Sequence, residues 1–201
     1  MKRIVIVDYG SGNLRSVYRG LEKSGARPVI TADIGEISAA DGIVLPGVGA
    51  FRDGMGQIGE MQQVLTEAAD AVPILGICLG MQMLLEWSEE HGLSAGLGII
   101  PGTVRRFPRV PGYKIPHMGW NSLSPEIPDH PLMSGIREGS YVYFVHSYYA
   151  DTPRSHVLTS TDYINTFASS VTSGNVQGVQ FHPEKSGATG LRILKNFIGL
   201  V

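Results

Sequence analysis

The chain has 201 residues, of which 43% are hydrophobic and 17% are charged, as is typical of one compact globular domain. Its formal net charge of −2 argues against nucleic acid or an anionic membrane as the main partner. One cysteine cannot form an internal disulfide, which fits a reducing cytoplasm. We therefore expect a single cytoplasmic domain over residues 1–201.

The first ninety residues alternate short apolar runs with segments of helical periodicity. The expected strands cover residues 4–7, 27–30, 42–46 and 72–77, and the expected helices cover 13–24, 55–71 and 81–90. The run at 4–7 is too short for a signal peptide or a membrane span, so we expect a first buried strand there. Continuous apolar strands between helices favour a parallel sheet with helices on both faces.

The second half of the chain is rich in proline, glycine and β-forming residues. Residues 96–180 therefore predict short, partly antiparallel strands and loops beside the first sheet. Residues 191–201 repeat apolar side chains at helical spacing, which predicts a final helix packed on the core. The expected fold class is α/β, with an open, mostly parallel central sheet and a smaller, partly antiparallel strand region.

Cys78 lies in the run ILGICLGMQ over residues 74–82. Gly-x-Cys-x-Gly behind an apolar stretch is typical of a strand that ends in a nucleophile and turns at once into a helix, because the tight bend leaves little room for flanking side chains. Such a turn directs the sulfur at a helix N-terminus and aims the Leu79 N–H at a developing oxyanion. A lone cysteine is more commonly a small buried hydrophobe, but that role does not require two flanking glycines.

The segment His182-Pro183-Glu184 supplies a candidate base and acid for this nucleophile. Residues i and i+2 of an extended segment point to the same side, so Glu184 can fix the tautomer of His182. Pro183 has no N–H to donate, which favours the end or edge of a strand. The sequence therefore predicts a Cys78–His182–Glu184 triad.

Cofactor motifs are not found. The run at residues 10–15 begins like a dinucleotide fingerprint but has Arg15 at the third glycine position, and no Gly-Lys pair is present for a phosphate-binding loop. The six histidines show no pair at the ligand spacing of a helix. We expect no metal and no tightly held organic cofactor.

An elbow cysteine followed about a hundred residues later by His-Pro-Glu resembles the class I, triad-type glutamine amidotransferases. Within that family the chain is similar to glutaminase subunits of a synthase in histidine biosynthesis. That closer similarity lies in the runs DYGSGNL (8–14), PGVGAF (46–51), PHMGWN (116–121) and HPEKS (182–186).

The resemblance implies that Cys78 attacks the side-chain amide of L-glutamine and that His182 protonates the departing ammonia. Leu79 would be one oxyanion donor, and the loop containing Val48 and Gly49 would supply the other. Many relatives read Pro-Gly-Gly where this chain has Val48, so the sequence leaves open which amide of the loop donates.

Substrate-binding positions also follow from the resemblance. Gln82 matches a substrate-contacting residue one turn into the helix after the nucleophile, although a solvent-facing glutamine is the alternative. His146, Ser147 and Tyr148 match a segment that contacts glutamine, and an ordinary strand end is equally compatible with that sequence. Gly49 would let the substrate approach the loop backbone closely.

A chain that releases ammonia but has no second active site needs a partner to use it. The resemblance identifies this partner as a (β/α)8-barrel cyclase. The candidate interface residues are Asn13, His117, Met118, Trp120, Asn121 and Lys185. For each single residue, core packing or a solvated surface role is about as plausible as contact. The group next to Pro116 and Gly119 favours a shaped loop over a strand interior.

Two other functions are compatible with the same residues. A stand-alone cysteine hydrolase acting on γ-glutamyl peptides could use the same triad without a partner. A non-enzymatic binding subunit could retain the fold, but it would not require Cys78, His182 and Glu184 together. Substrate size and thiol reactivity distinguish these functions from the glutaminase.

Overall fold

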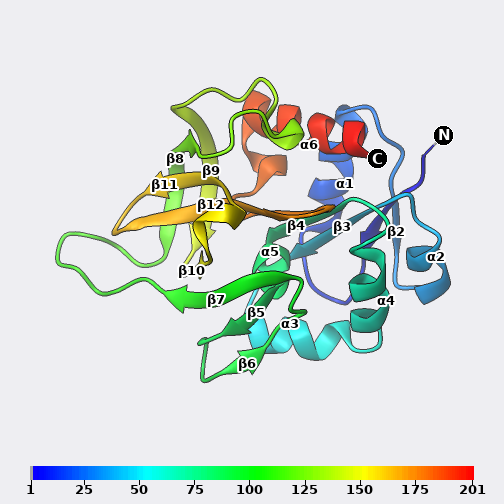
Figure 1. The fold of residues 1–201 in the computed structure, drawn as a ribbon, viewed down its shortest axis with the longest axis horizontal. Coiled ribbons are helices and arrows are strands. Elements are labelled where there is room, and N and C mark those ends of the chain that lie inside the picture. The colour runs from blue at the N-terminus through cyan, green and yellow to red at the C-terminus, as the bar shows by residue number, and fades with distance from the viewer. Residues whose placement is uncertain (1) are drawn as a thin grey trace.

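The computed structural model describes residues 2–201, which form one large mixed sheet with helices packed against it (Figure 1). The strands are β1 (Ile4–Val7), β2 (Val29–Thr31), β3 (Gly42–Gly47), β4 (Ile74–Cys78), β5 (Leu85–Ser88), β6 (Ser94–Ala95), β7 (Ile100–Arg106), β8 (His117–Pro125), β9 (Ser140–His146), β10 (Tyr148–Asp151), β11 (Val157–Asp162), β12 (Thr166–Ser173) and β13 (Val176–Val179). The helices are α1 (Leu14–Lys23), α2 (Ile34–Ser38), α3 (Phe51–Ile58), α4 (Met61–Ala68), α5 (Leu79–Met83) and α6 (Gly187–Leu200), with short 3-10 helices η1 (Pro131–Met133), η2 (Arg154–His156) and η3 (Pro183–Lys185). Within residues 2–201, no helix is both long enough and apolar enough to cross a membrane.

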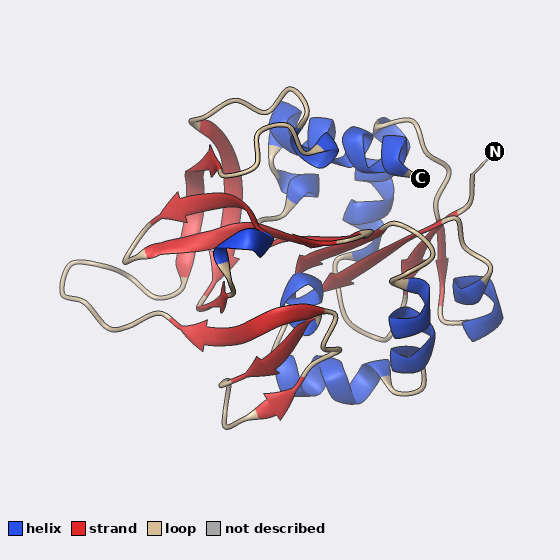
Figure 2. Ribbon diagram, in the orientation of Figure 1, coloured by secondary structure: helices blue, strands red, loops and turns tan. Residues whose placement is uncertain are grey.

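The sheet has a parallel part and a mixed part. Strands β2, β1, β3, β4 and β13 lie side by side and run parallel. From β13 the sheet continues through the antiparallel neighbours β12, β10 and β7, while β11, β8 and β9 extend it from β12. Helices lie on both sides of the parallel strands in Figure 2. The predicted fold class is confirmed.

Two apolar cores lie on the two faces of the parallel strands. In β1, Ile4 and Ile6 pack into the core that α1 and α6 cover, whereas Val5 and Val7 pack into the core of α2 to α5. Successive residues of a strand point to opposite faces, so a strand covered on both faces needs apolar residues at every position. This burial explains the continuous apolar runs of the first half.

Two predicted helices differ in the structure. The helix expected over 55–71 is two helices, α3 and α4, separated at Gly59, whose φ of +47° is a conformation that side-chain-bearing residues rarely adopt. The helix expected over 81–90 ends at Met83, and residues 85–88 form β5 between β6 and β7. Pairing with strands distant in sequence overrides the local helical pattern there.

The expected loop around residues 116–121 is also different. Residues 117–125 form β8, which pairs along its length with β9 in antiparallel register. Alternation along β8 buries His117 and Leu123 and exposes Met118 and Trp120. The prediction of a shaped loop was wrong, because Gly119 and Trp120 can both be accommodated in a strand that has one face exposed to solvent.

Candidate active site

Cys78 lies at the junction of β4 and α5, as the sequence predicts. Its backbone has φ +55° and ψ −110°, a strained conformation for a residue with a side chain. A Cβ at Gly80 would collide with the carbonyl oxygen of Leu45, and one at Gly76 would lie 2.8 Å from the backbone of Met81. The flanking glycines therefore allow the sharp turn that turns the sulfur out of the sheet.

His182 and Glu184 lie beside this elbow, because β13 is the parallel neighbour of β4. His182 Nδ1 lies 2.9 Å from Glu184 Oε1, and the two side chains are 3% and 0% exposed. Pro183 begins η3, so the carboxylate reaches the imidazole through a 3-10 turn rather than along an extended strand. A carboxylate only accepts, so the proton of this bond is on Nδ1, and Nε2 is left for the nucleophile.

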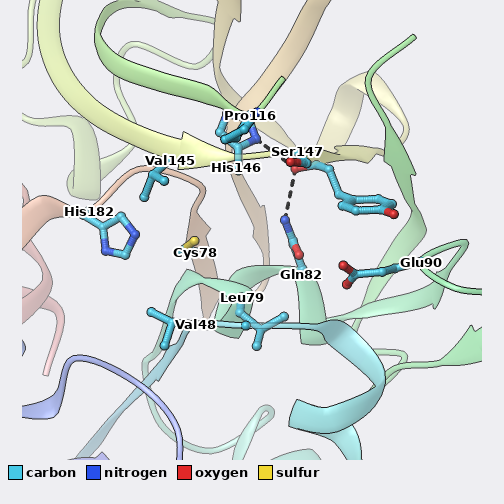
Figure 3. A pocket seen from close by; sticks show the side chains of 12 residues that line it. Val48, Cys78, Leu79, Gln82, Glu90, Pro116, Val145, His146, Ser147 and His182 are labelled. Atoms are coloured by element: carbon cyan, nitrogen blue, oxygen red, sulfur yellow. Dashed lines mark hydrogen bonds between the residues drawn. The ribbon is translucent and has the colours of Figure 1, made fainter. Parts of the chain in front are cut away.

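The charge state of His182 depends on its burial, on the Cys78 sulfur and on the Glu184 carboxylate. Burial disfavours the imidazolium, but the Cys78 sulfur and the Glu184 carboxylate favour it more, so the pKa of His182 rises from 6.5 to about 9. His182 Nε2 itself is buried without a well-formed hydrogen bond. The sulfur therefore raises the pKa of the ring although the hydrogen bond between them is not well formed, as is common before substrate binds. Figure 3 shows the ring and the sulfur at the same side of the cavity.

A cavity of about 330 Å³ lies over Cys78. This volume is at the small end of the range for ligand sites, about 300–1,000 Å³. It brings together sequence-predicted residues from distant parts of the chain: Val48, Gly49, Cys78, Leu79, Gln82, His146, Ser147, Tyr148 and His182. Residues from β4, α5, the loop after β3, the β9–β10 connection and the segment after β13 thus meet at one end of the parallel strands, where open α/β sheets bind ligands.

Gln82 and His146 are held by the protein itself. Gln82 Nε2 donates to the carbonyl of Tyr148 at 3.1 Å and to Gln180 Oε1 at 3.0 Å, so both amide protons are used and only its carbonyl oxygen can accept from a ligand. His146 Nδ1 contacts the Tyr148 carbonyl at 2.8 Å, and its Nε2 contacts His117 at 2.9 Å. The ring nitrogens of His146 are therefore not available to a substrate, although the residue lines the cavity.

The loop after β3 has a defined backbone direction. Gly49 has φ +99°, whereas Val48 is outside the positive-φ region, so the left-handed position of the loop belongs to glycine. The Val48 carbonyl accepts a hydrogen bond from Ser11 Oγ at 2.7 Å. Because C=O and N–H are antiparallel across a trans peptide bond, the Gly49 N–H points away from Ser11. Leu79, the other predicted donor, is the first residue of α5.

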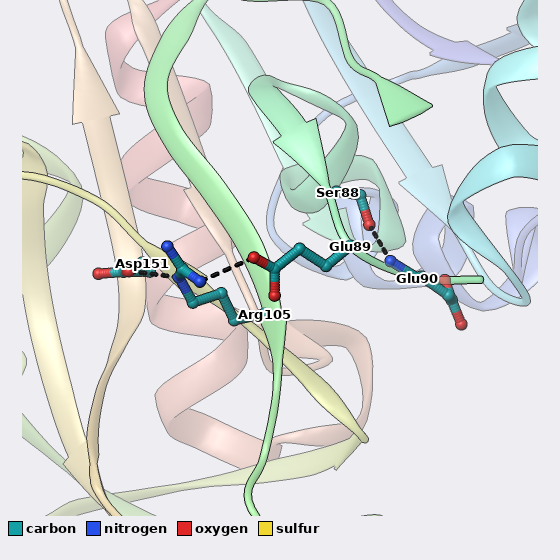
Figure 4. Close-up of polar contacts among 5 residues, drawn as sticks. All are labelled: Ser88, Glu89, Glu90, Arg105 and Asp151. Carbon is teal, nitrogen blue, oxygen red and sulfur yellow. Dashed lines mark hydrogen bonds and ion pairs between the residues drawn. The ribbon is translucent and has the colours of Figure 1, made fainter. Parts of the chain in front are cut away.

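Glu90 is a cavity residue that the sequence did not reveal. Its Oε2 accepts the backbone N–H of Phe51, the first residue of α3, at 2.7 Å. Its own N–H donates to Ser88 Oγ at 3.1 Å, and Arg105 joins the neighbouring Glu89 to Asp151 (Figure 4). No short motif contains Glu90, so only the pairing of β5 with β7 could have indicated its position.

The predicted interface residues do not share one environment. Met118 and Trp120 are 62% and 55% exposed on the outer face of β8, and Lys185 is exposed on η3. Asn13 and Asn121 are half-buried. His117 is only 4% exposed, stacked between Phe144 and Tyr163. A partner cannot reach His117 directly, so its place in the predicted interface was wrong: the strand turns it inward.

Comparison with known proteins gives a consistent picture. Residues 5–200 match the family described as glutamine amidotransferase class-I. A protein named imidazole glycerol phosphate synthase subunit HisH from Methanosarcina acetivorans is 56% identical, with 98% of each chain covered. The protein of the same name from Halobacterium salinarum is 57% identical, with 97% of this chain and 92% of that relative covered.

Solved structures share the fold at low identity. The structure titled PurLQS from Thermotoga maritima has a TM-score of 0.77 at 21% identity, with 99% of both chains covered. The glutaminase domain of Trypanosoma brucei CTPS, with bound acivicin, has a TM-score of 0.68 at 19% identity, with 100% of this chain and 95% of that chain covered. These two similarities concern the fold alone.

Proposed function

The chain belongs to the class I glutamine amidotransferase family, and from this premise we propose that it is the glutaminase subunit of an imidazole glycerol phosphate synthase. It hydrolyses L-glutamine to glutamate and ammonia and passes the ammonia to a cyclase subunit, which makes imidazole glycerol phosphate and an aminoimidazole carboxamide ribotide in histidine biosynthesis. One observation carries the chemistry: Cys78 and the His182–Glu184 pair meet over one small cavity.

The proposed reaction uses the triad in two stages. Cys78 attacks the amide carbon of glutamine, and His182 gives its proton to the departing ammonia. His182 then activates a water that hydrolyses the γ-glutamyl thioester, which releases glutamate and restores the sulfur. Glu184, fully buried against Nδ1, orients the ring and stabilises its cationic form in both stages.

Two backbone amides are proposed to hold the oxyanion of each tetrahedral intermediate. The Leu79 N–H follows the nucleophile directly at the start of α5. The second donor is proposed to be the Gly49 N–H, because the Ser11 bond to the Val48 carbonyl defines the direction of that peptide. Removing one oxyanion donor typically costs about 2.7–4 kcal/mol in the barrier.

The α-amino and carboxylate groups of glutamine need partners of opposite charge or suitable polarity. We assign the ammonium to Glu90, because it is the acidic residue among those lining the cavity. The carbonyl oxygen of Gln82 and the backbone of residues 146–148 are proposed to complete the site. Charge pairing in such a confined site favours an amino acid over a larger peptide.

The partner is proposed to be a (β/α)8-barrel cyclase that docks on the outer face of β8. Met118 and Trp120 present exposed apolar area there, together with Tyr141 at 59% exposure on the adjacent β9. Exposed aromatic and methionine side chains on one face are characteristic of protein interfaces. Lys185, next to the catalytic segment, is proposed as a charged contact of the same interface. A cytoplasmic location belongs to the proposal, since the mechanism requires a reduced thiol at Cys78.

The relatives favour this function over a stand-alone γ-glutamyl hydrolase. Full-length relatives above 50% identity carry the name of a synthase subunit. A partner-independent hydrolase would act on γ-glutamyl peptides larger than glutamine.

The test is a glutaminase assay of the chain alone, with the cyclase, and with the cyclase plus its nucleotide-like substrate. We expect glutamine hydrolysis to rise with the complete set. Full activity without the cyclase, or preference for γ-glutamyl peptides, would contradict the proposal.

A further inference from the structure

Gln180 touches the sulfur of Cys78 and has no part in the chemistry above. Its side chain is fully buried, at 0% exposure, and its Nε2 lies 3.7 Å from Cys78 Sγ. It directly follows β13, the parallel neighbour of the strand that ends in Cys78. We propose that Gln180 is a catalytic residue that donates an N–H to the sulfur of Cys78 and holds it over the substrate cavity. This inference rests on the proposed function, since it takes Cys78 as the nucleophile.

The direction of the Gln180 amide follows from its neighbours. The carbonyl of Tyr148 can only accept, so the group of Gln82 that faces it must be the amide nitrogen. The same nitrogen lies 3.0 Å from Gln180 and must face an acceptor there, which is Oε1. The other end of the Gln180 amide, which faces Cys78, is therefore the NH₂ group. A backbone carbonyl thus determines the orientation of both glutamines.

The anchoring carbonyl is itself part of a longer buried chain. Burial lowers the pKa of His146 to about 3 and of His117 to about 4, so both rings are neutral. His146 Nδ1 must donate to the Tyr148 carbonyl, which leaves its Nε2 to accept from His117 Nδ1. His117 Nε2 then accepts from Asn121 on β8. Each member has one possible donor direction, so the chain is rigidly ordered from β8 to the sulfur.

The chemistry of this contact suits a thiolate. A hydrogen bond from a neutral amide to a charged sulfur favours the charged form without offering a proton that could transfer. His182 lies beside the same sulfur and supplies the exchangeable proton. The sulfur bears little charge in the thioester and regains it as the leaving group during hydrolysis. The Gln180 bond therefore strengthens whenever the thiolate forms, and it fixes the direction of the sulfur for attack.

The test compares alkylation of Cys78 by iodoacetamide at neutral pH in the full chain and in three variants. Gln180→Met keeps the length of the side chain but removes the N–H. Gln180→Glu keeps its shape but places an acceptor against the sulfur. Gln177→Met is the control, because Gln177 is also buried on β13, at 3% exposure, but its Nε2 donates to the carbonyl of Gly174 and not to the sulfur.

We expect alkylation to be about ten- to hundredfold slower in Gln180→Met than in the wild type, which corresponds to the loss of one hydrogen bond to a charged group. Alkylation of Gln180→Glu should be at least as slow as that of Gln180→Met. Gln177→Met should react like the wild type. In the complex with the cyclase, kcat for glutamine should fall in both Gln180 variants while KM changes little, because the contact is with the sulfur rather than with bound glutamine. A role limited to packing would leave alkylation of Gln180→Met at the wild-type rate, because methionine fills the same space without an N–H.

Wild-type alkylation rates in Gln180→Met or Gln180→Glu would overturn the inference. If Gln180→Met does not fold, as judged by its circular dichroism, Gln180→Leu, which also removes the N–H without adding charge, takes its place in the same comparison. Slow alkylation of Cys78 in the wild type would instead contradict the proposed function, because it would remove the reactive thiol itself. The two failures are therefore distinguishable in one experiment.

Discussion

Replacing Glu184 by glutamine tests how the buried carboxylate controls His182. The substitution keeps the size of the side chain but removes the charge 2.9 Å from Nδ1. Because the side chain of Glu184 is 0% exposed, water does not screen its charge. A hydrogen bond to a charged group is worth about 1.5–3 kcal/mol, and 1.36 kcal/mol corresponds to one pKa unit, so the pKa of His182 should fall by about 1–2 units.

The sign of the effect follows from the pKa of about 9 in the wild type. His182 is then an imidazolium below about pH 9 and loses its proton above it, so the basic limb of kcat/KM for glutamine should lie near pH 9. In Glu184→Gln, the limb should move to about pH 7–8. The assay is glutamate release by the complex between about pH 6 and 10, the range that contains both limbs. Glu138→Gln, an exposed position, is the control. An unchanged basic limb in Glu184→Gln would refute the assignment of the carboxylate to the stabilisation of His182.

Three further predictions concern the elbow, the interface and the substrate. Gly80→Ala should lower the melting temperature by roughly 3–10 °C, because the added Cβ would collide with the Leu45 carbonyl oxygen on β3. The control Gly199→Ala, whose Cβ would have no neighbour within reach, should melt like the wild type, and equal melting temperatures of the two variants would contradict the prediction. Trp120→Ala should weaken cyclase binding in a titration by about 2 kcal/mol or more, whereas the control Trp87→Ala, at an exposed position on β5, should bind normally. A normal affinity of Trp120→Ala would contradict the assignment of Trp120 to the interface. Glu90→Gln should raise KM for glutamine at least about tenfold with little change in kcat. An unchanged KM would contradict the proposal that Glu90 binds the ammonium group of glutamine.

The residues that act through local geometry were predictable from the sequence. The two glycines around Cys78 depend on a turn of a few residues, which the structure shows. The two-residue spacing of His182 and Glu184 also indicated their contact, although a 3-10 turn forms it instead of the expected extended segment. The alternation of apolar strands and helices also indicated the parallel sheet, because burial on both faces requires apolar residues at every strand position.

The residues that act through long-range pairing were not predictable. Gln180 reaches the sulfur only because β13 pairs with β4, and Glu90 reaches the cavity only because residues 85–88 form a strand beside β7 instead of continuing a helix. Local periodicity cannot distinguish these arrangements. His117 is different: strand alternation, applied to residues 117–123, would have placed it on the same inward face as Leu123 and opposite the exposed face of Met118 and Trp120.

The central claim is that Cys78 forms a γ-glutamyl thioester that His182 helps to make and to hydrolyse. The most direct measurement is mass spectrometry of the complex quenched during glutamine turnover. A γ-glutamyl adduct on the peptide that contains Cys78, absent from Cys78→Ser, is the predicted result. Undiminished glutamine hydrolysis by Cys78→Ser, or an adduct on any other residue, would contradict it.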